Sequence, residues 1–313
     1  MISIRYHLIS ISAVLLALAV GVLLGSSTLS RELLGGLSRE NDNLIGQVSD
    51  LEQRGDSLSV RLAEADSFAS TIGPLAVRGQ LTGRTIALVT TADADPDDRD
   101  ALKVLISAAG ATVAGELELT EAFTDPRRSD ELKEIVTRSL PAGVQLPTVS
   151  DPGSLAGGLL GPLLLIRKSD NKPQASAPES AAALTALADG GFLQVADGFA
   201  PAQLAIVLIG AAPAGDDGPD RSATLARFAA QVDRSGAGAV LTGPVGTAGG
   251  SGAVGLARAD TSVAQILSTV DNVNTPAGRI VTLLALREQL DERSGRYGVA
   301  GNAQALAPGL TTG

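Results

Sequence analysis

The stretch TIALVTTADADPDDRDALKVLISAA, residues 85–109, decides how the second part of the chain folds. Its first six residues are apolar or β-branched, which is typical of a buried strand. A helix is predicted from Pro96 to Ala109, because the helix dipole favours the acidic residues that crowd its first turn. A buried strand followed by a helix of this length is the building unit of an α/β domain.

The same alternation continues along the chain. Further strands are expected at 111–119, 163–167, 204–209 and 239–242, and helices at 129–139, 180–188, 223–232 and 276–292. Strands that alternate with such helices predict a mostly parallel sheet. Hydrophobic residues make up 44% of the chain and aromatic residues only 2%, so the core is expected to be aliphatic. A polar loop is expected at 169–178.

An apolar run, LISISAVLLALAVGVLLGSSTL, precedes this domain and covers residues 8–29 without a charge. About 20 apolar residues span the hydrocarbon core of a bilayer, so the run predicts one transmembrane helix. Arg5 lies before the run, and after it the opposite charges of Arg31 and Glu32 nearly cancel. The positive-inside bias therefore predicts a cytoplasmic N-terminus. The alternative is a cleaved signal peptide, whose apolar core is usually shorter.

A seven-residue leucine repeat follows the apolar run, in LGGLSRENDNLIGQVSDLEQRGDSLSVRL, residues 34–62. Leucine at position d, with Val and one Asn at position a, is typical of a parallel two-stranded coiled coil. The predicted dimer contacts are Leu37, Asn41, Leu44, Val48, Leu51, Leu58 and Leu62. The alternative is a single amphipathic helix that folds against the globular domain, and Gly55 at position a weakens the coiled-coil prediction.

These patterns divide the chain into four segments. Residues 1–29 are predicted to form a cytoplasmic tip and a transmembrane anchor, and residues 30–70 a coiled-coil stalk. Residues 71–300 are predicted to form an extracytoplasmic α/β domain with a mostly parallel sheet, and residues 301–313 a disordered tail. The stalk would hold the domain roughly 50 Å from the membrane, at 1.5 Å per helical residue.

Aspartates crowd the loop after the first predicted strand. Asp93, Asp95, Asp97 and Asp98 are the candidate metal ligands, because carboxylate oxygens suit Ca²⁺ or Mg²⁺. The spacing lacks the glycine and the terminal Glu of a calcium-binding loop, and Arg99 interrupts it. A solvated loop that caps a helix explains the same residues, so both interpretations stay open.

Other signals point away from enzyme chemistry. The letters GSGAVG at 250–255 match a dinucleotide-binding pattern, but several residues separate them from the preceding strand and no clear helix start follows. His7 is the only histidine, beside the predicted anchor, and cysteine is absent, which excludes Ser-His-Asp and Cys-His catalysis in the outer domain. A net charge of −10 argues against a nucleic-acid partner.

Several segments resemble the mycobacterial copper transport protein family (MctB-like) of actinobacterial envelope proteins. They are MISIRYHLISISAVLLALAVGVLLGSS at 1–27, EADSF at 64–68, and STVDNVNTPAGRIVTLLALREQL at 268–290, followed by RYG. The resemblance implies a role in copper homeostasis, with copper as the transported ion, no bound cofactor, and a location that includes the outer membrane. It also implies envelope or cytoplasmic protein partners.

The amino-acid composition of the chain fits direct copper binding poorly. Cu(I) prefers thiolate, thioether and imidazole ligands, whereas this chain has no Cys, one His and one Met. Two hypotheses therefore remain from the sequence. The first is an envelope protein of copper homeostasis, and the second is a non-enzymatic dimeric scaffold or regulator of cell separation that binds protein partners.

Overall fold

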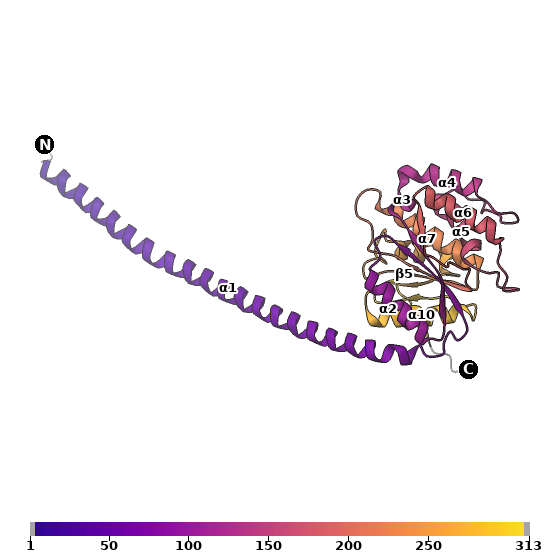
Figure 1. Cartoon of the computed structure of the whole chain (residues 1–313). Helices are drawn as coiled ribbons and strands as arrows, with labels where there is room; N and C mark the ends of the chain where they lie inside the picture. The colour runs from indigo at the N-terminus through magenta and orange to yellow at the C-terminus, as the bar shows by residue number, and fades with distance from the viewer. Residues whose placement is uncertain (1–3, 310–313) are drawn as a thin grey trace. The chain divides into compact units, whose positions relative to one another are not determined.

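The computed structural model describes residues 4–309, and within that range the side chains of 26–39 are not described. The first element, α1, is a continuous helix from Ile4 to Ala76 (Figure 1). The chain divides into two compact units, one before Asp66 and one from Asp66 onward. Of the predicted dimer contacts, the side chain of Leu37 lies outside the described residues. The others, from Asn41 to Leu62, lie on α1 and are exposed.

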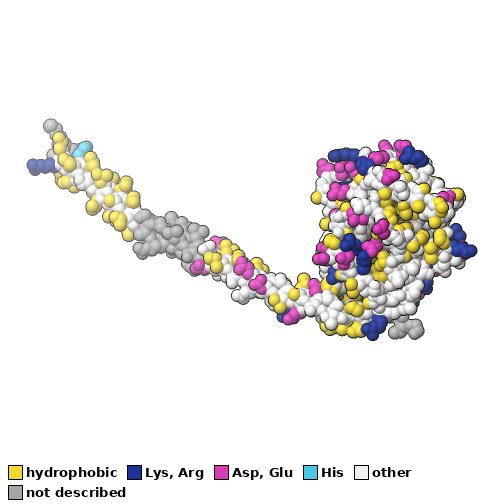
Figure 2. Space-filling view, in the orientation of Figure 1, with side chains coloured by type: hydrophobic (Ala, Val, Ile, Leu, Met, Phe, Trp, Pro, Cys, Tyr) yellow, Lys and Arg dark blue, Asp and Glu magenta, His cyan; other side chains and the backbone are white. Residues whose placement is uncertain are grey.

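The N-terminal part of α1 is long and apolar enough to cross a membrane. The stretch Ile4–Gly25 has 22 residues, a mean hydropathy of 2.6 and no buried residue. The space-filling view shows mostly hydrophobic side chains there (Figure 2). The sequence predicts a run from Leu8 to Leu29, and the last four residues of this run lie outside the described side chains.

A mixed sheet forms the centre of the second unit. Within the described residues it has seven strands in the order β3-β2-β1-β4-β5-β6-β7. All neighbouring strands are parallel except β3, which runs antiparallel to β2. The strands are β1 Thr85–Thr91, β2 Thr112–Leu119, β3 Leu193–Val195, β4 Leu204–Leu208, β5 Ala239–Thr242, β6 Ser268–Val270 and β7 Arg296–Tyr297. The predicted mixed α/β fold with a mostly parallel sheet is confirmed.

Helices cover both faces of the sheet, because alternate strand residues point to opposite faces and both sets are apolar (Figure 1). On one face lie α2 and α10 and on the other α4 to α8. The helices after α1 are α2 Pro96–Ala108, α3 Glu121–Thr124, α4 Ser129–Arg138, α5 Pro152–Leu164, α6 Ala177–Asp189, α7 Gly218–Ser235, α8 Ala253–Ala259, α9 Thr261–Ala264 and α10 Pro276–Gln289.

Short polar signals fix where these helices begin. Asp95, Asp151 and Thr275 each accept a hydrogen bond from a backbone N–H in the first turn and are followed directly by Pro at the first helical position. Ser176 and Glu179 form a reciprocal capping box at the start of α6. The sequence contains all of these signals, which explains why α2 and α10 begin where the sequence predicts.

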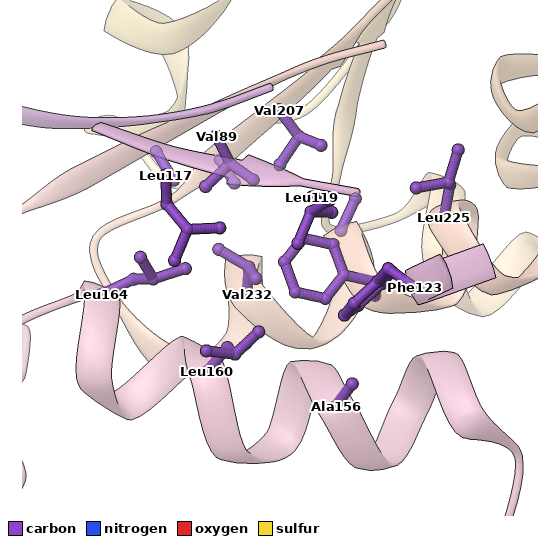
Figure 3. Packing of buried hydrophobic residues seen from close by; sticks show 14 of the residues in the cluster. Val89, Leu117, Leu119, Phe123, Ala156, Leu160, Leu164, Val207, Leu225 and Val232 are labelled. Atoms are coloured by element: carbon purple, nitrogen blue, oxygen red, sulfur yellow. The ribbon is translucent and has the colours of Figure 1, made fainter. Parts of the chain in front are cut away.

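The larger core lies between the sheet and helices α5 and α7. Figure 3 shows side chains of α5, among them Leu160 and Leu164, directed at residues of the sheet. Phe123 and Phe228 meet edge to face, with ring centroids 5.3 Å apart. As predicted, the remaining buried side chains are mostly aliphatic.

The predicted strand at 163–167 is wrong. Leu163 and Leu164 end helix α5, and Leu165 makes only an isolated bridge to Ala202. Four glycines lower the intrinsic helix propensity of α5. The helix forms because two of its glycines allow close packing against α7. A Cβ at Gly157 would lie 2.7 Å from the nearest α7 atom, and a Cβ at Gly161 would lie 2.2 Å from the nearest α7 atom.

The short strands β3, β6 and β7 are further differences from the sequence prediction, since two or three residues give too short a pattern to detect. The segment at 301–309, where a disordered tail is expected to begin, makes contacts with the domain. Asn302 bonds with Arg258 and with the carbonyl of Ala248, and Ala305 pairs with Tyr297. These long-range contacts, which the local composition does not reveal, hold this segment on the domain.

Candidate functional site

A crevice lies where the two central strands part. From β1 the chain moves to β2 on one side, whereas β4 leads to β5 on the other, so the carboxyl ends of β1 and β4 mark the topological switch point. Ligands of open α/β sheets usually bind at this place. The crevice has a volume of about 150 Å³ and is lined by residues that include Thr91, Asp93, Glu121, Gly210 and Arg221.

Several polar groups that line this crevice already form hydrogen bonds within the protein. The N–H of Gly210 donates to the hydroxyl of Thr91 at 3.0 Å, and a Cβ at Gly210 would lie 2.4 Å from the Asp93 carboxyl group. The guanidinium of Arg221 donates to the Thr124 hydroxyl at 3.2 Å and to the Glu121 carbonyl at 3.4 Å. Small-molecule sites usually enclose about 300–1,000 Å³. The crevice is therefore suited to water or a very small polar group, and not to a nucleotide.

The four candidate metal ligands, among them the exposed Asp97 of the first turn of α2, do not form one ligand cluster. Asp95 caps α2 by accepting from the N–H of Asp97 at 2.9 Å, and Asp93 lies beside Gly210. Asp98 pairs with Arg279 of α10 at 2.6 Å, and its burial raises its pKa against the opposing effect of that guanidinium. Among the side chains of residues 4–25 and 40–309, no group of three or more His, Asp or Glu residues is arranged to hold a metal ion. The capping alternative accounts for Asp95, and an ion pair accounts for Asp98.

The segment GSGAVG at 250–255, which matches a dinucleotide-binding pattern, has a packing role in the structure. A helix, α8, does begin at Ala253, which corrects the expectation that no helix start follows them. A Cβ at Gly252 would lie 2.2 Å from the carbonyl oxygen of Thr247, and one at Gly255 would lie 2.8 Å from that of Ala248. These glycines thus allow the loop after β5 to fold closely onto α8.

A buried ion pair, which the sequence analysis did not identify, lies at the carboxyl end of β6. Arg258 and Asp271 are 2.7 Å apart, with 2% and 1% of their side chains exposed. Arg258 also donates to the Tyr297 carbonyl, the Asn302 side chain and the Thr269 hydroxyl. Burial lowers the pKa of Arg258, while the Asp271 carboxylate opposes that shift. Because both charges are satisfied internally, this pair acts as a structural anchor.

The Asp271 carboxylate also orders the loop after β7. It accepts from the N–H groups of Val299 and Ala300, at 2.8 and 3.3 Å. Gly298 has a φ of +127°, and a Cβ there would overlap the carboxyl group. The sequence carried a partial signal, since RYG at 296–298 and the segment around Asp271 both belong to the family resemblance.

Another buried acid holds the turn between α7 and β5. Asp233 accepts from the N–H of Ala239 at 2.7 Å. Burial raises the pKa of Asp233 to about 7, against the opposing effects of this hydrogen bond and of Arg234 and Lys168. Its position in the last turn of α7, with a backbone partner just before β5, gives it a structural role in the domain.

A wider groove of about 460 Å³ lies between α6, the end of α5 and the segment after β3. Its lining is mainly apolar and includes Leu163, Leu184, Val195 and Phe199, with Ser180 and Thr185 as the polar side chains. A groove of this size suits an apolar group, and it offers no hard or soft ligand set for a metal ion.

Comparison with known proteins gives a match along nearly the whole chain. The family model described as "Copper transport outer membrane protein, MctB" matches residues 1–308. The relative named "Copper transporter MctB" from Mycobacterium tuberculosis (strain ATCC 25618 / H37Rv) is 36% identical over 311 residues, which cover 98% of this chain and 99% of the relative. The relative of the same name from Mycobacterium leprae (strain TN) is 38% identical over 314 residues, with the same coverage.

Proposed function

Because this chain belongs to the MctB family, we propose that it is a membrane-anchored, non-enzymatic component of copper export in the cell envelope. The observation that carries this proposal is the match over residues 1–308, which includes the apolar helix as well as the α/β domain. Relatives named as copper transporters have the same extent, since 99% of each is covered.

Copper is the cargo in this proposal, and the side chains limit how the protein handles it. Met1 and His7 are the only side chains of the types that Cu(I) prefers, and both precede the uncharged run at 8–29. The α/β domain can offer only oxygen ligands, which bind Cu(II) with little selectivity. The protein therefore supports export by holding or organising a transport complex, and a partner or a larger assembly supplies the conducting path.

The membrane arrangement follows from the N-terminal sequence. Arg5 precedes the uncharged run at 8–29, and its positive charge favours a cytoplasmic N-terminus and an extracytoplasmic α/β domain. An apolar helix is typical of the inner membrane, whereas spans of the outer membrane are typically β-barrels. The family description names the outer membrane, so a protein anchored in one membrane and acting on the other agrees with both observations.

A parallel homodimer completes the proposal. The predicted a and d residues that the structure describes all lie on one continuous helix, and Leu44, Leu51 and Leu58 are 54–66% exposed. Exposed leucines at seven-residue spacing are stabilised when two such helices pair. Two chains anchored in one membrane share the orientation that a parallel pair needs.

Deletion of the gene is expected to raise cell-associated copper several-fold under copper load, as measured by mass spectrometry. Complementation with the full chain is expected to restore the parental level. The matched control is zinc content in the same cells, which is expected to stay constant because the proposed complex exports copper. Unchanged copper in the deletion strain would contradict the proposed role in export.

The dimer has its own test, because the chain contains no cysteine. Leu44→Cys is expected to form a disulfide-linked dimer in membranes under mild oxidation, since residues at d face each other across a parallel pair. Gly46→Cys, at position f on the outer face of the same helical turn, is the control and is expected to stay monomeric on a denaturing gel. Equal products from both variants would show random collision, and no product from Leu44→Cys would contradict the coiled coil.

A further inference from the structure

The groove of about 460 Å³ follows one face of α6. The residues of α6 that line it recur every three or four positions from Ala177 to Ala188. This spacing is that of a single helix face, and it covers about 16 Å at 1.5 Å per residue. Val195 and Phe199 belong to the opposite wall, and the fully buried Leu163 lies at the floor. The groove is therefore a trough that runs along three turns of α6.

The dimensions of the groove indicate what fits in it. Its volume divided by its length of about 16 Å gives a mean cross-section of about 29 Å². A helix with its side chains is about 10–12 Å wide, and an extended peptide needs about 5 by 10 Å, so each has a larger cross-section. A single hydrocarbon chain is thinner than both. The groove therefore has room for one unbranched chain, and its volume lies within the range of small-molecule sites.

No charged side chain lines the groove, among the residues that the structure describes. Ser180 and Thr185 contribute the polar side chains of the lining. A charged group inside the groove would lose its hydration without gaining a charged partner, which is unfavourable. Ala177, Ala181 and Ala188 keep the wall of α6 smooth, because their side chains end at Cβ. A smooth and uncharged trough suits a chain of methylene groups.

Unpaired acids lie beside the lining residues. Asp189 directly follows Ala188, the last residue of α6 that lines the groove. Asp197 lies in the turn between Val195 and Phe199 on the opposite wall. Both acids are exposed, and neither belongs to an ion pair among the side chains of residues 4–25 and 40–309. The two carboxylates are therefore available to a positively charged group.

The basic residues near the groove do not offset these acids. Arg128 donates to the carbonyl of Gly190 at 2.8 Å, beside the end of α6, but it is paired with Glu131 at 2.7 Å. Lys172 lies shortly before α6, where Glu179 in the first helical turn opposes its charge. The rim thus has an excess of negative charge, which attracts a cationic head group and repels an anionic one.

We propose that this groove binds the hydrocarbon chain of a single-chain amphiphile whose ammonium head group lies near Asp189, at the end of α6. The chain lies along the alanines of α6 and passes Phe199, so that methylene groups meet only apolar atoms and hydroxyl groups. The proposal depends on neither copper export nor the coiled-coil dimer, since every residue of the groove belongs to the α/β domain. It gives this domain a lipid-binding site.

Photo-cross-linking of the full chain in phosphatidylcholine nanodiscs tests the site. The probe is a tetradecyltrimethylammonium ion with a diazirine in its chain, and the comparison probe is tetradecyl sulfate with the same diazirine. Labelled residues are identified by peptide mass spectrometry, and labelling of Ile4–Gly25 serves as the measure of probe in the bilayer. Relative to that measure, the cationic probe is expected to label residues 177–188 several-fold more than the anionic probe.

Two variants locate the chain and the head group. Ala181→Trp fills the groove and is expected to reduce labelling of α6 by the cationic probe several-fold. Ala182→Trp is the matched control, because Ala182 is the next residue, is exposed and does not line the groove. Asp189→Asn changes an exposed charge alone. It is expected to reduce labelling by the cationic probe several-fold and to leave labelling by tetradecanol with the same diazirine unchanged.

The outcomes separate this inference from the other proposals. Equal labelling of α6 in Ala181→Trp and Ala182→Trp would overturn the site. Preference for the sulfate probe, or no effect of Asp189→Asn, would overturn the ammonium head group. If Ile4–Gly25 is labelled and α6 is not, the hydrocarbon chain is overturned as the occupant, and an apolar peptide becomes the candidate. If Ile4–Gly25 is not labelled, the membrane anchor fails, whereas the variants still decide on the groove.

Discussion

Replacing Arg258 by Met is expected to lower the free energy of unfolding of the α/β domain by about 3–5 kcal/mol, because the change leaves a buried carboxylate without its partner. The side chain of Asp271 is only 1% exposed, so water does not replace the lost guanidinium. The bonds from Arg258 to the Tyr297 carbonyl and to Asn302 disappear as well. The loss therefore affects β6, the strand β7 and the segment around residue 302 together.

The measurement is urea unfolding of the detergent-solubilised full chain, followed by tyrosine fluorescence. The chain has no Trp and two Tyr, and Tyr297 is buried in this network, so its signal reports the unfolding of the domain. Arg287→Met is the matched control. It breaks an exposed pair with Asp291 on α10 at 2.7 Å and is expected to cost about 0.5 kcal/mol or less. Equal losses for both variants would contradict the structural role of the buried pair.

Replacing Gly157 by Leu is expected to destabilise the domain by about 1–3 kcal/mol, because the substitution overpacks the contact between α5 and α7. A Cβ at Gly157 would lie 2.7 Å from the Cβ of Gln231 and 2.7 Å from the carbonyl oxygen of Phe228. Backbone atoms cannot move aside as a flexible side chain does. The better helix propensity of Leu contributes about 1 kcal/mol in the opposite direction, so the steric effect determines the sign.

Gly46→Leu is the control for this prediction, since Gly46 lies on α1 and a Cβ at this residue would have no atom within 4 Å. The same urea experiment is expected to show an unchanged midpoint for the domain in this variant. A Gly157→Leu midpoint equal to that of the parent would show that α5 is free to move away from α7, in contradiction to the close packing described above.

The sequence alone determined the elements whose signals are local. An uncharged apolar run is detectable from composition, and it led to the helix that includes Ile4–Gly25. Buried parallel strands such as β1 and β4 consist of apolar or β-branched residues, and caps such as Asp95 and Thr275 precede a proline. These features need no knowledge of distant residues. The α/β class and the family were therefore predictable from the chain.

The sequence was less informative about the candidate sites. It indicated that aspartates cluster after β1, but the structure separates their roles, since Asp98 is paired with Arg279, a residue 181 positions away. It did not indicate that Arg258 and Asp271 form one buried pair, because nothing in the local pattern of either residue distinguishes it from a surface charge.

Tertiary structure also decided the conformation of segments with conflicting local preferences. The glycine-rich segment 152–164 has a poor intrinsic tendency to form a helix, yet it becomes α5, because its small residues fit against α7 and its leucines fill the core under the sheet (Figure 3). The strands β6 and β7 form because they extend an existing sheet. Local sequence signals, namely apolar runs and capping residues, thus determined the apolar helix, the helix starts and the central strands. Burial and long-range pairing, whose free energy depends on residues far apart in the chain, decided the rest.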